Sequence, residues 1–169
     1  EPASAQRRAI PLPPRPFTVV ETSIADLRTA LEQNRVTSRE LVRLYLERIA
    51  LYEDKLNAVI TVNPQALAIA DSLDRERAAG RLRGPLHGIP IVLKDNYDTK
   101  DIPTTGGSLA LANHQPTADA FIVGKLRAAG AVILLAQVLA CWLQVHQQRN
   151  VVTDPFPVVV VELDPDMAR

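Results

Sequence analysis

The residue whose type and position point most directly to chemistry is Lys94. It ends the segment 88–94 (GIPIVLK), which is too short for a helix and too apolar for a surface loop. Branched aliphatic residues with Gly and Pro before them and Asp-Asn after them are typical of a buried strand. We therefore expect Lys94 to be buried at the end of a strand, where α/β folds place ligands and reactive groups. Desolvation there would favour the neutral amine, which can act as a general base.

Ser108 is the second candidate for chemistry, because a Ser–Lys dyad is a known catalytic pairing. It ends the segment 104–108 (TTGGS), which places its hydroxyl on a loop after the lysine strand. A nucleophile also needs an oxyanion hole, and no other segment of the sequence supplies one. Gly and Ser are common turn residues. We therefore favour a turn-forming role for Ser108 over a nucleophilic one.

The other reactive side chains lack the spacing of metal or nucleotide sites. Calcium loops use alternate positions around a central glycine, whereas three aspartates here recur every third residue: Asp95, Asp98 and Asp101. The histidines are too widely separated for a zinc pattern: His87, His114 and His146. Asp119 stands where a phosphate loop ending at Lys125 would need its first glycine. We predict solvated aspartates, structural histidines, and neither a metal nor a nucleotide site.

Several sequence blocks, taken in order, resemble the N-terminal part of amidase-signature hydrolases. They are residues 56–59 (LNAV), 84–96 (GPLHGIPIVLKDN), 105–108 (TGGS), 119–120 (DA) and 128–134 (AAGAVIL). In that family the lysine of the GIP-hydrophobic-LKD block belongs to a Ser–cis-Ser–Lys triad, and Lys94 stands at this position. The resemblance therefore implies that Lys94 is the catalytic base, that the substrate is a small amide, and that no metal or organic cofactor is needed.

The resemblance covers residues 20–134 and then ends. The family continues with a Gly-Lys-Thr-Asn segment and a Gly- and Ser-rich stretch that carries the bridging serine and the nucleophile, whereas residues 135–139 here are LAQVL. The last serine is Ser108, and all seven glycines lie between Gly80 and Gly130. We therefore divide the chain into an extended Pro-rich lead-in (1–20), an amidase-signature N-terminal portion (21–134) and a divergent tail (135–169).

The resemblance implies amide C–N bond hydrolysis of the Ser–cis-Ser–Lys type, and the missing serine segment predicts that this truncated chain is inactive by itself. Two alternatives stay open. One is a non-catalytic fragment or pseudoenzyme that acts only by association with another chain. The other is a protein like the A subunit of glutamine amidotransferases, which generates ammonia from glutamine for tRNA-linked amidation. The residues that would distinguish these functions, and those that select the substrate, lie downstream of the resemblance.

The elements that must position Lys94 follow from local patterns. Ser23 begins a helix that extends to Gln33, and the capping box of Thr37 and Glu40 begins a second helix. The later elements alternate: a strand at 58–62, a helix from 66 to Gly80, a strand at 89–94, a helix at 119–129 and a strand at 131–135. In the tail, the patterns favour a helix at 141–149 and a strand at 158–161.

This order predicts an α/β fold, the N-terminal part of an amidase-signature fold. Two helices would lead into a mixed, mainly parallel sheet whose strands are connected by crossover helices, because strand–helix–strand order favours parallel pairing. The carboxyl ends of parallel strands meet at one edge of a sheet, and Lys94 would lie at that edge.

Composition argues against several classes of partner. The 19 basic and 19 acidic side chains leave no net charge to recruit nucleic acid or an anionic membrane. No apolar run reaches the length of a membrane span.

The single cysteine, Cys141, cannot form an internal disulfide. Residues 3–5 (ASA) have the form of a signal cleavage site without an apolar h-region, so a cytoplasmic and an exported location both stay open, as does the oligomeric state.

Overall fold

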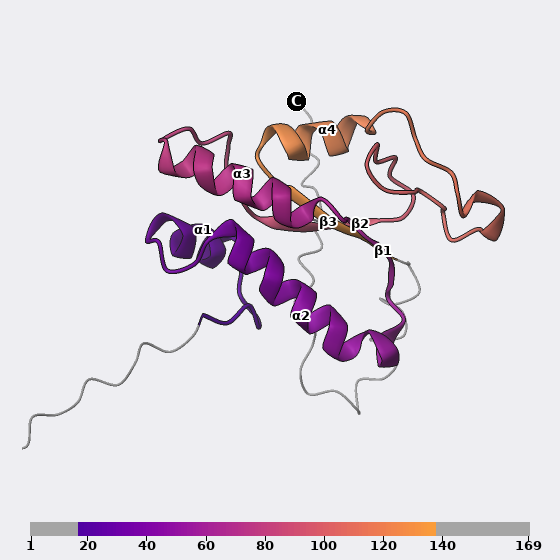
Figure 1. Ribbon diagram of the computed structural model, residues 1–169, viewed down its shortest axis with the longest axis horizontal. Helices are drawn as coiled ribbons and strands as arrows, with labels where there is room; N and C mark the ends of the chain where they lie inside the picture. Colours follow the sequence, from indigo (N-terminus) through magenta and orange to yellow (C-terminus); the bar gives the residue numbers. More distant parts are fainter. Residues whose placement is uncertain (1–16, 138–169) are drawn as a thin grey trace, which may run out of the picture.

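Helices and strands follow one another in the order that the sequence predicts (Figure 1). The computed structural model describes residues 17–137. The strand expected at 131–135 runs to Gln137, and the elements expected at 141–149 and 158–161 lie outside the described residues. The elements are α1 (Ile24–Glu32), α2 (Ser38–Leu56), β1 (Val59–Val62), α3 (Ala66–Ala78), β2 (Pro90–Lys94), the short 3₁₀ helix η1 (Leu109–Leu111), α4 (Phe121–Ala128) and β3 (Val132–Gln137).

Both N-terminal helices begin at the residues that the sequence predicts. At α1, the Ser23 hydroxyl accepts the Asp26 N–H at 3.2 Å, and the Asp26 carboxylate accepts the Ser23 N–H at 3.2 Å. Thr37 and Glu40 form the same reciprocal pair at α2, with distances of 3.1 and 2.8 Å. Each pair satisfies backbone N–H groups that have no partner within the helix. The predicted capping box of Thr37 and Glu40 and the predicted helix start at Ser23 are therefore confirmed, and the structure adds a second capping box at Ser23 and Asp26.

A carboxylate from α3 adds a second cap to α2. Asp74 accepts the Ser38 N–H at 2.8 Å and the Arg39 N–H at 3.0 Å. An acidic group is favourable at this place, because the N-terminus of a helix carries a partial positive charge. The two hydrogen bonds span 36 and 35 residues of sequence, so they also fasten the start of α2 to α3.

The sheet has three strands among the described residues, in the order β1-β3-β2. β2 and β3 are parallel and are connected through α4, as predicted. β1 is antiparallel to β3, so the sheet is mixed, but it contains one parallel and one antiparallel pairing where the sequence predicted mainly parallel pairing. The rule behind the prediction applies to strands that pair with each other across a crossover helix. β1 and β2 both pair with β3 and not with each other, so the rule does not set the direction of β1. α3 is therefore not a crossover between neighbouring parallel strands.

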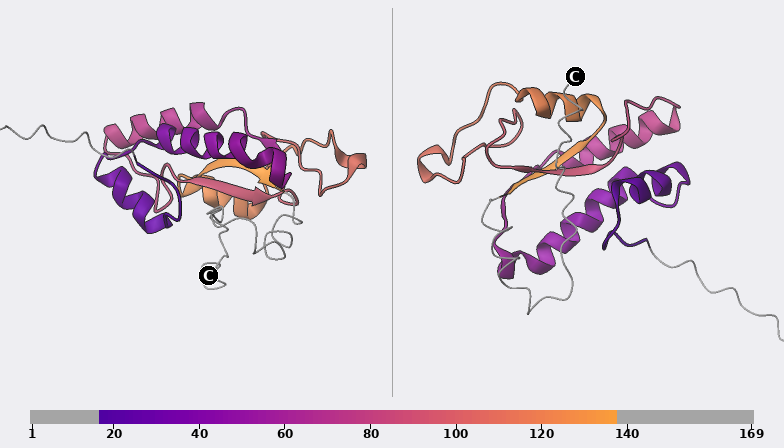
Figure 2. Two further views of the ribbon diagram at one scale, coloured as in Figure 1. Left: turned by 90° about the horizontal axis from the view of Figure 1, so that it is seen from below. Right: turned by 180° about the vertical axis from the view of Figure 1, so that it is seen from behind.

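The sheet lies between two layers of helices. α2 and α3 lie on one face and α4 lies on the other (Figure 2). β3 alternates between these layers: Ile133 belongs to the cluster that includes α4, and Val132 and Leu134 belong to the cluster that includes α3. Leu135 also packs in the α3 cluster, because the register between β2 and β3 shifts after Ile91. Such a shift, a β-bulge, places two consecutive residues of one strand on the same side.

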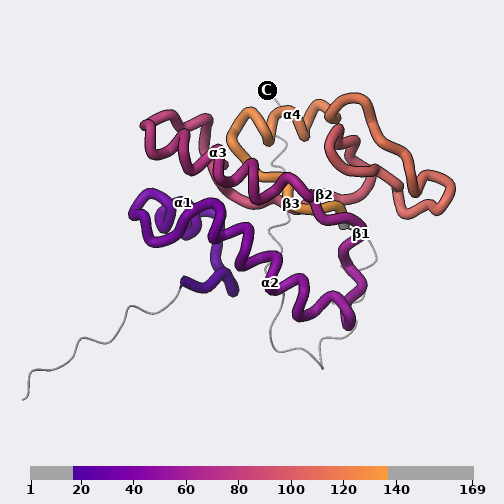
Figure 3. Tube along the Cα trace, viewed as in Figure 1, coloured from indigo at the N-terminus to yellow at the C-terminus, as the bar shows by residue number. Residues whose placement is uncertain are grey.

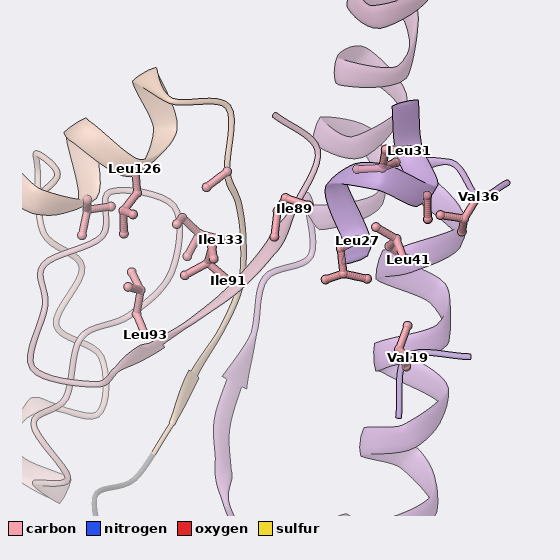
Figure 4. Close-up of a cluster of buried hydrophobic side chains, with 13 residues drawn as sticks. Val19, Leu27, Leu31, Val36, Leu41, Ile89, Ile91, Leu93, Leu126 and Ile133 are labelled. Carbon is pink, nitrogen blue, oxygen red and sulfur yellow. The ribbon is translucent and has the colours of Figure 1, made fainter. Parts of the chain in front are cut away.

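β2 contributes its apolar side chains to both layers. Ile89, at the entrance to the strand, and Ile91 and Leu93 within it pack with Leu126 of α4 in one buried cluster (Figure 4). Val92 packs against the cluster on the opposite face. This alternation is the period-two pattern of a strand that is covered on both sides. The strand is therefore held in place by the core up to its last apolar residue.

His87 is structural, as the sequence analysis predicts. Its ring is buried, with Nδ1 accepting the Arg83 N–H at 3.1 Å and Nε2 lying 2.9 Å from the Leu73 carbonyl oxygen. Since Nδ1 accepts, the proton lies on Nε2, which donates to Leu73. The ring thus joins α3 to the segment before β2. His114 lies exposed on the loop before α4, and His146 lies outside the described residues.

The loop between β2 and α4 extends away from the sheet and carries η1 near its far end (Figure 3). Its apolar residues Leu109 and Leu111 are exposed to 94% and 45%. Within residues 17–137, none of the helices is both long enough and apolar enough to cross a bilayer.

Candidate active site

Lys94 is the last residue of β2, at the carboxyl end of a strand that is parallel to β3. In the sheet register it lies opposite Gln137. Its predicted place at a strand end is confirmed. The predicted burial is wrong, because the side chain is exposed in the part of the chain that the structure describes. The physical reason is that the core covers β2 only as far as Leu93, so residues 17–137 do not desolvate the amine.

The chain turns immediately after Lys94. The Tyr97 N–H donates to the Lys94 carbonyl at 3.2 Å, which closes a turn over residues 94–97. Asp95 is the second residue of this turn and is only 4% exposed. The sequence analysis predicted a solvated aspartate here, and that prediction is wrong. Its carboxylate is buried because a distant segment of the loop folds over it.

That segment is the Thr105-Gly106-Gly107 turn, which donates three consecutive backbone N–H groups to Asp95. Thr105 N–H donates to Oδ1 at 2.9 Å, Gly106 N–H donates to the Asp95 backbone carbonyl at 2.8 Å, and Gly107 N–H donates to Oδ2 at 3.1 Å. The Thr105 hydroxyl also donates to Oδ2. We call this arrangement the Asp95 clasp: Asp95 together with residues 105–107.

Ser108 follows the Asp95 clasp and lies exposed. Its N–H donates to the Thr105 carbonyl at 2.9 Å, and its own carbonyl accepts the Leu111 N–H at 3.0 Å. These bonds form the turn that leads into η1, which agrees with the turn-forming role. The three amides that precede Ser108 are already bonded to Asp95, so they cannot also bind an oxyanion. The geometry thus adds to the case against Ser108 as a nucleophile.

Comparison with known proteins identifies the family. The family model described as Amidase matches residues 40–155. The chain belongs to the amidase family. A putative amidase of Schizosaccharomyces pombe is 42% identical over 127 residues, which cover 75% of this chain and 22% of the relative. A probable amidase of Arabidopsis thaliana is 45% identical over 129 residues, covering 75% of this chain and 25% of the relative.

A solved structure shares the fold of this amidase-family chain. The native peptide amidase of Stenotrophomonas maltophilia is 47% identical, with a TM-score of 0.69 over 72% of this chain and 26% of that one. The fold class, the N-terminal part of an amidase-signature fold, is therefore shown. The chain spans about a quarter of the length of these relatives, 25% and 26% in two cases. The division of the chain at residue 134 stays a prediction.

A second polar cluster of the amidase-family chain joins the long loop to α4, and the sequence analysis missed it. Arg127 of α4 lies 2.5 Å from Asp101 Oδ1 and, through Nε, 3.1 Å from Asp119 Oδ2. Asn63 is buried, donating through Nδ2 to the Ile133 carbonyl at 2.8 Å and to Asp101 at 3.3 Å. The only signal in the sequence was the Asp-Ala block at 119–120, which carries no information about its partner.

This cluster shows that the prediction of a solvated aspartate is wrong for Asp101 as well as for Asp95. Asp101 is partly buried and ion-paired, whereas Asp98 is exposed, as predicted. Within residues 17–137, no group of three or more His, Cys, Asp or Glu side chains converges in a way that could hold a metal ion.

Proposed function

We propose that this chain supplies the lysine base of an amide C–N hydrolase whose substrate is a small amide. The observation that supports the proposal is the position of Lys94 at the carboxyl end of β2, within the segment shared with relatives named amidases. A lysine at such an edge can reach a substrate bound outside the sheet. Lys94 is the catalytic residue that we assign to this chain. The proposed chemistry requires no metal or organic cofactor.

The chemistry that the resemblance implies is acyl transfer through serine. A neutral Lys94 amine would take a proton, through a bridging serine, from a nucleophilic serine. The serine oxygen forms a bond to the amide carbonyl carbon, and the C–N bond breaks as the amine leaves with a proton. Water then cleaves the acyl-enzyme and restores the serine hydroxyl. In the first half Lys94 passes the serine proton to the leaving amine, and in the second half it takes a proton from water and returns it to the serine oxygen.

In the family that this chain resembles, both serines of this scheme follow the strand that ends near Leu134. Residues 109–169 contain no serine, so this stretch does not supply them. A general base is typically worth about 10² to 10⁴ in rate, and only when it acts on a positioned nucleophile. We therefore propose that the 169-residue chain alone has no turnover above background. The complete site needs a Gly- and Ser-rich segment that follows the position of Leu134.

The experiment compares the chain with a chimera in which residues after Leu134 are replaced by the corresponding region of the peptide amidase relative. Both are assayed on small aryl and aliphatic amides. The chain alone should give background rates, and the chimera should be active, inactive as Lys94→Ala and active as Ser108→Ala. Turnover by the chain alone that disappears in both variants would instead establish a Ser108–Lys94 dyad. A chimera whose activity survives Lys94→Ala would overturn the proposal.

A second candidate function rests on a specific relative. The A subunit of a glutamyl-tRNA(Gln) amidotransferase from Geobacter sulfurreducens is 45% identical over 115 residues, covering 68% of this chain and 24% of that subunit. A chain of this kind would act together with partner subunits. Release of ammonia from glutamine by the chimera, without cleavage of aryl amides, would favour this function.

The non-catalytic alternative has its own test. A fragment that acts only by association should bind a separately expressed C-terminal portion of an amidase relative without restoring activity. Restored activity would assign the pair to the catalytic class.

A further inference from the structure

Asp95 carries a buried carboxylate that no cation neutralises within residues 17–137. It is 4% exposed, and its oxygens accept the Thr105 and Gly107 N–H groups and the Thr105 hydroxyl. A buried charge is strongly unfavourable unless hydrogen bonds replace its hydration. Hydrogen bonds from backbone amides to a carboxylate are among the stronger ones in proteins. The Asp95 clasp therefore depends on all of its donors.

The glycines of the clasp have the backbone conformations that bring these donors together. Gly106 and Gly107 have φ values of 58° and 76°, in the left-handed region that side chains with a Cβ rarely adopt. No atom lies within 4 Å of a Cβ built at either position, so space does not select glycine here. The turn is built so that amides 105 and 107 meet the carboxylate and amide 106 meets the Asp95 carbonyl.

The clasp acts on the residue next to the proposed base. The Lys94 carbonyl accepts the Tyr97 N–H, and the peptide unit that follows is fixed by Gly106 at the Asp95 carbonyl. On its other side, Lys94 is held in the sheet by its pairing with β3 opposite Gln137. The backbone of Lys94 is thus fixed both before and after its exposed side chain.

We propose that Asp95 is a positioning residue for Lys94. The inference rests on the proposed role of Lys94 as a base, which needs the amine at one place relative to a proton donor. Lysine has a long, flexible side chain, so a fixed backbone is the part of its position that this chain can supply. Displacement of a reacting group by about 1 Å can reduce a rate by about 10²-fold. Asp95 prevents such displacement by tying the strand end to residues 105–107.

The first test measures backbone amide exchange in the 169-residue chain and in two variants, Asp95→Asn and Asp98→Asn. An asparagine keeps one acceptor oxygen but turns an NH₂ donor toward a donor of the clasp. Loss of a charged hydrogen bond should speed exchange of amides 97 and 105–107 by about tenfold or more. Asp98→Asn is the matched control, because Asp98 is exposed and contributes a backbone carbonyl to Ala120. Unchanged exchange in Asp95→Asn overturns the clasp.

The second test connects the clasp to the amine of Lys94. A trace amount of an amine-acylating reagent labels all lysines, and the rate at Lys94 is divided by the rate at exposed Lys55 of α2 in the same molecule. In Asp95→Asn this ratio should move by about half or more of the way toward its value in the urea-unfolded chain. A merely structural role of Asp95 would leave the ratio unchanged while the fold persists, and that outcome overturns the proposal.

A milder variant keeps the test decisive if Asp95→Asn does not fold. Thr105→Val removes the hydroxyl bond to Oδ2 and the bond that the hydroxyl accepts from the Gly107 N–H, and it leaves all three amide bonds to Asp95 in place. It should shift amide exchange and the labelling ratio in the same direction by a smaller factor. Failure of this proposal is distinct from failure of the proposed function. The labelling ratio tests positioning in the chain itself, and the chimera tests whether Lys94 acts as a base.

Discussion

Gly130, which follows α4, lies directly against the backbone of His87. A Cβ at Gly130 would lie 2.6 Å from the His87 Cα and 3.2 Å from its nitrogen. Gly130 has a φ of 90°, and its carbonyl accepts the Gly88 N–H at 2.8 Å. This contact sets the distance between the start of β3 and the segment that leads into β2. The two strands that end beside the candidate active site are therefore aligned by a glycine at their opposite end.

We expect Gly130→Ala to destabilise the chain by about 3 kcal/mol, because the added methyl group meets rigid backbone and the conformation is strained. The measurement is the urea midpoint. Gly124→Ala is the control: Gly124 lies within α4, a Cβ there meets no atom within 4 Å, and alanine should stabilise the helix by about 1 kcal/mol. Equal midpoints for the two variants would contradict the close approach.

Ser38 and Gly88 form a second tight contact, at the junction of α2 with the segment before β2. A Cβ at Gly88 would lie 2.0 Å from Ser38 Oγ and 3.0 Å from Ser38 Cβ. We expect Gly88→Ala to cost about 3 kcal/mol. Adding Ser38→Ala should restore about 1 kcal/mol of it, because the hydroxyl clash disappears and the Cβ contact stays. Additive effects in a double-mutant cycle of unfolding free energies would show that the two residues do not touch.

Asp74 should stabilise α2 more than its acidic neighbour does. Asp74→Ala removes both hydrogen bonds to the first amides of α2, and we expect a loss of about 1 to 2 kcal/mol. Asp71→Ala removes an ion pair with Arg39 whose side chains are both about half exposed, at 50% and 45%, so its loss should be below about 1 kcal/mol. Thermal unfolding of both variants checks the order, and a larger loss for Asp71→Ala would contradict the capping role.

The parts of this structure that the sequence predicts depend on residues close together in the chain. The helix start at Ser23 and the capping box of Thr37 and Glu40 depend on residues within one helical turn, and the strand that ends at Lys94 is defined by its own apolar run. The burial of Asp95 depends on Thr105 and Gly107, ten and twelve residues further along, and no local pattern encodes that contact. The same reason explains the failure to predict the Arg127 cluster.

Strand direction and the exposure of Lys94 are also non-local properties. The alternation of strands and helices fixes the order of β1, β2 and β3 along the chain but not their order in the sheet. The apolar run before Lys94 shows that β2 is covered, yet how far the cover extends depends on where α4 and α3 end relative to the strand. The resemblance to the amidase-signature family compares several sequence blocks in order, so it contains information about residues far apart in the chain. Periodicity and capping rules consider one segment at a time and lack that information.

The capping box of α1 predicts a specific dependence on pH. Hydrogen bonds from the Ser23 side chain and then from its backbone hold the pKa of Asp26 below its ordinary value of 3.8. Because the folded-state pKa is lower than the unfolded one, the stabilisation is complete above the unfolded value and is lost as the pH falls through the folded value. Ser23→Ala should raise the pKa of Asp26 toward 3.8, as followed by the carboxyl carbon shift in an NMR titration. Thr29→Ala, which changes a hydroxyl bonded to the Ala25 carbonyl in the same helix, should leave the pKa of Asp26 unchanged. An Asp26 pKa that is the same in Ser23→Ala as in the parent would refute the capping box as its cause.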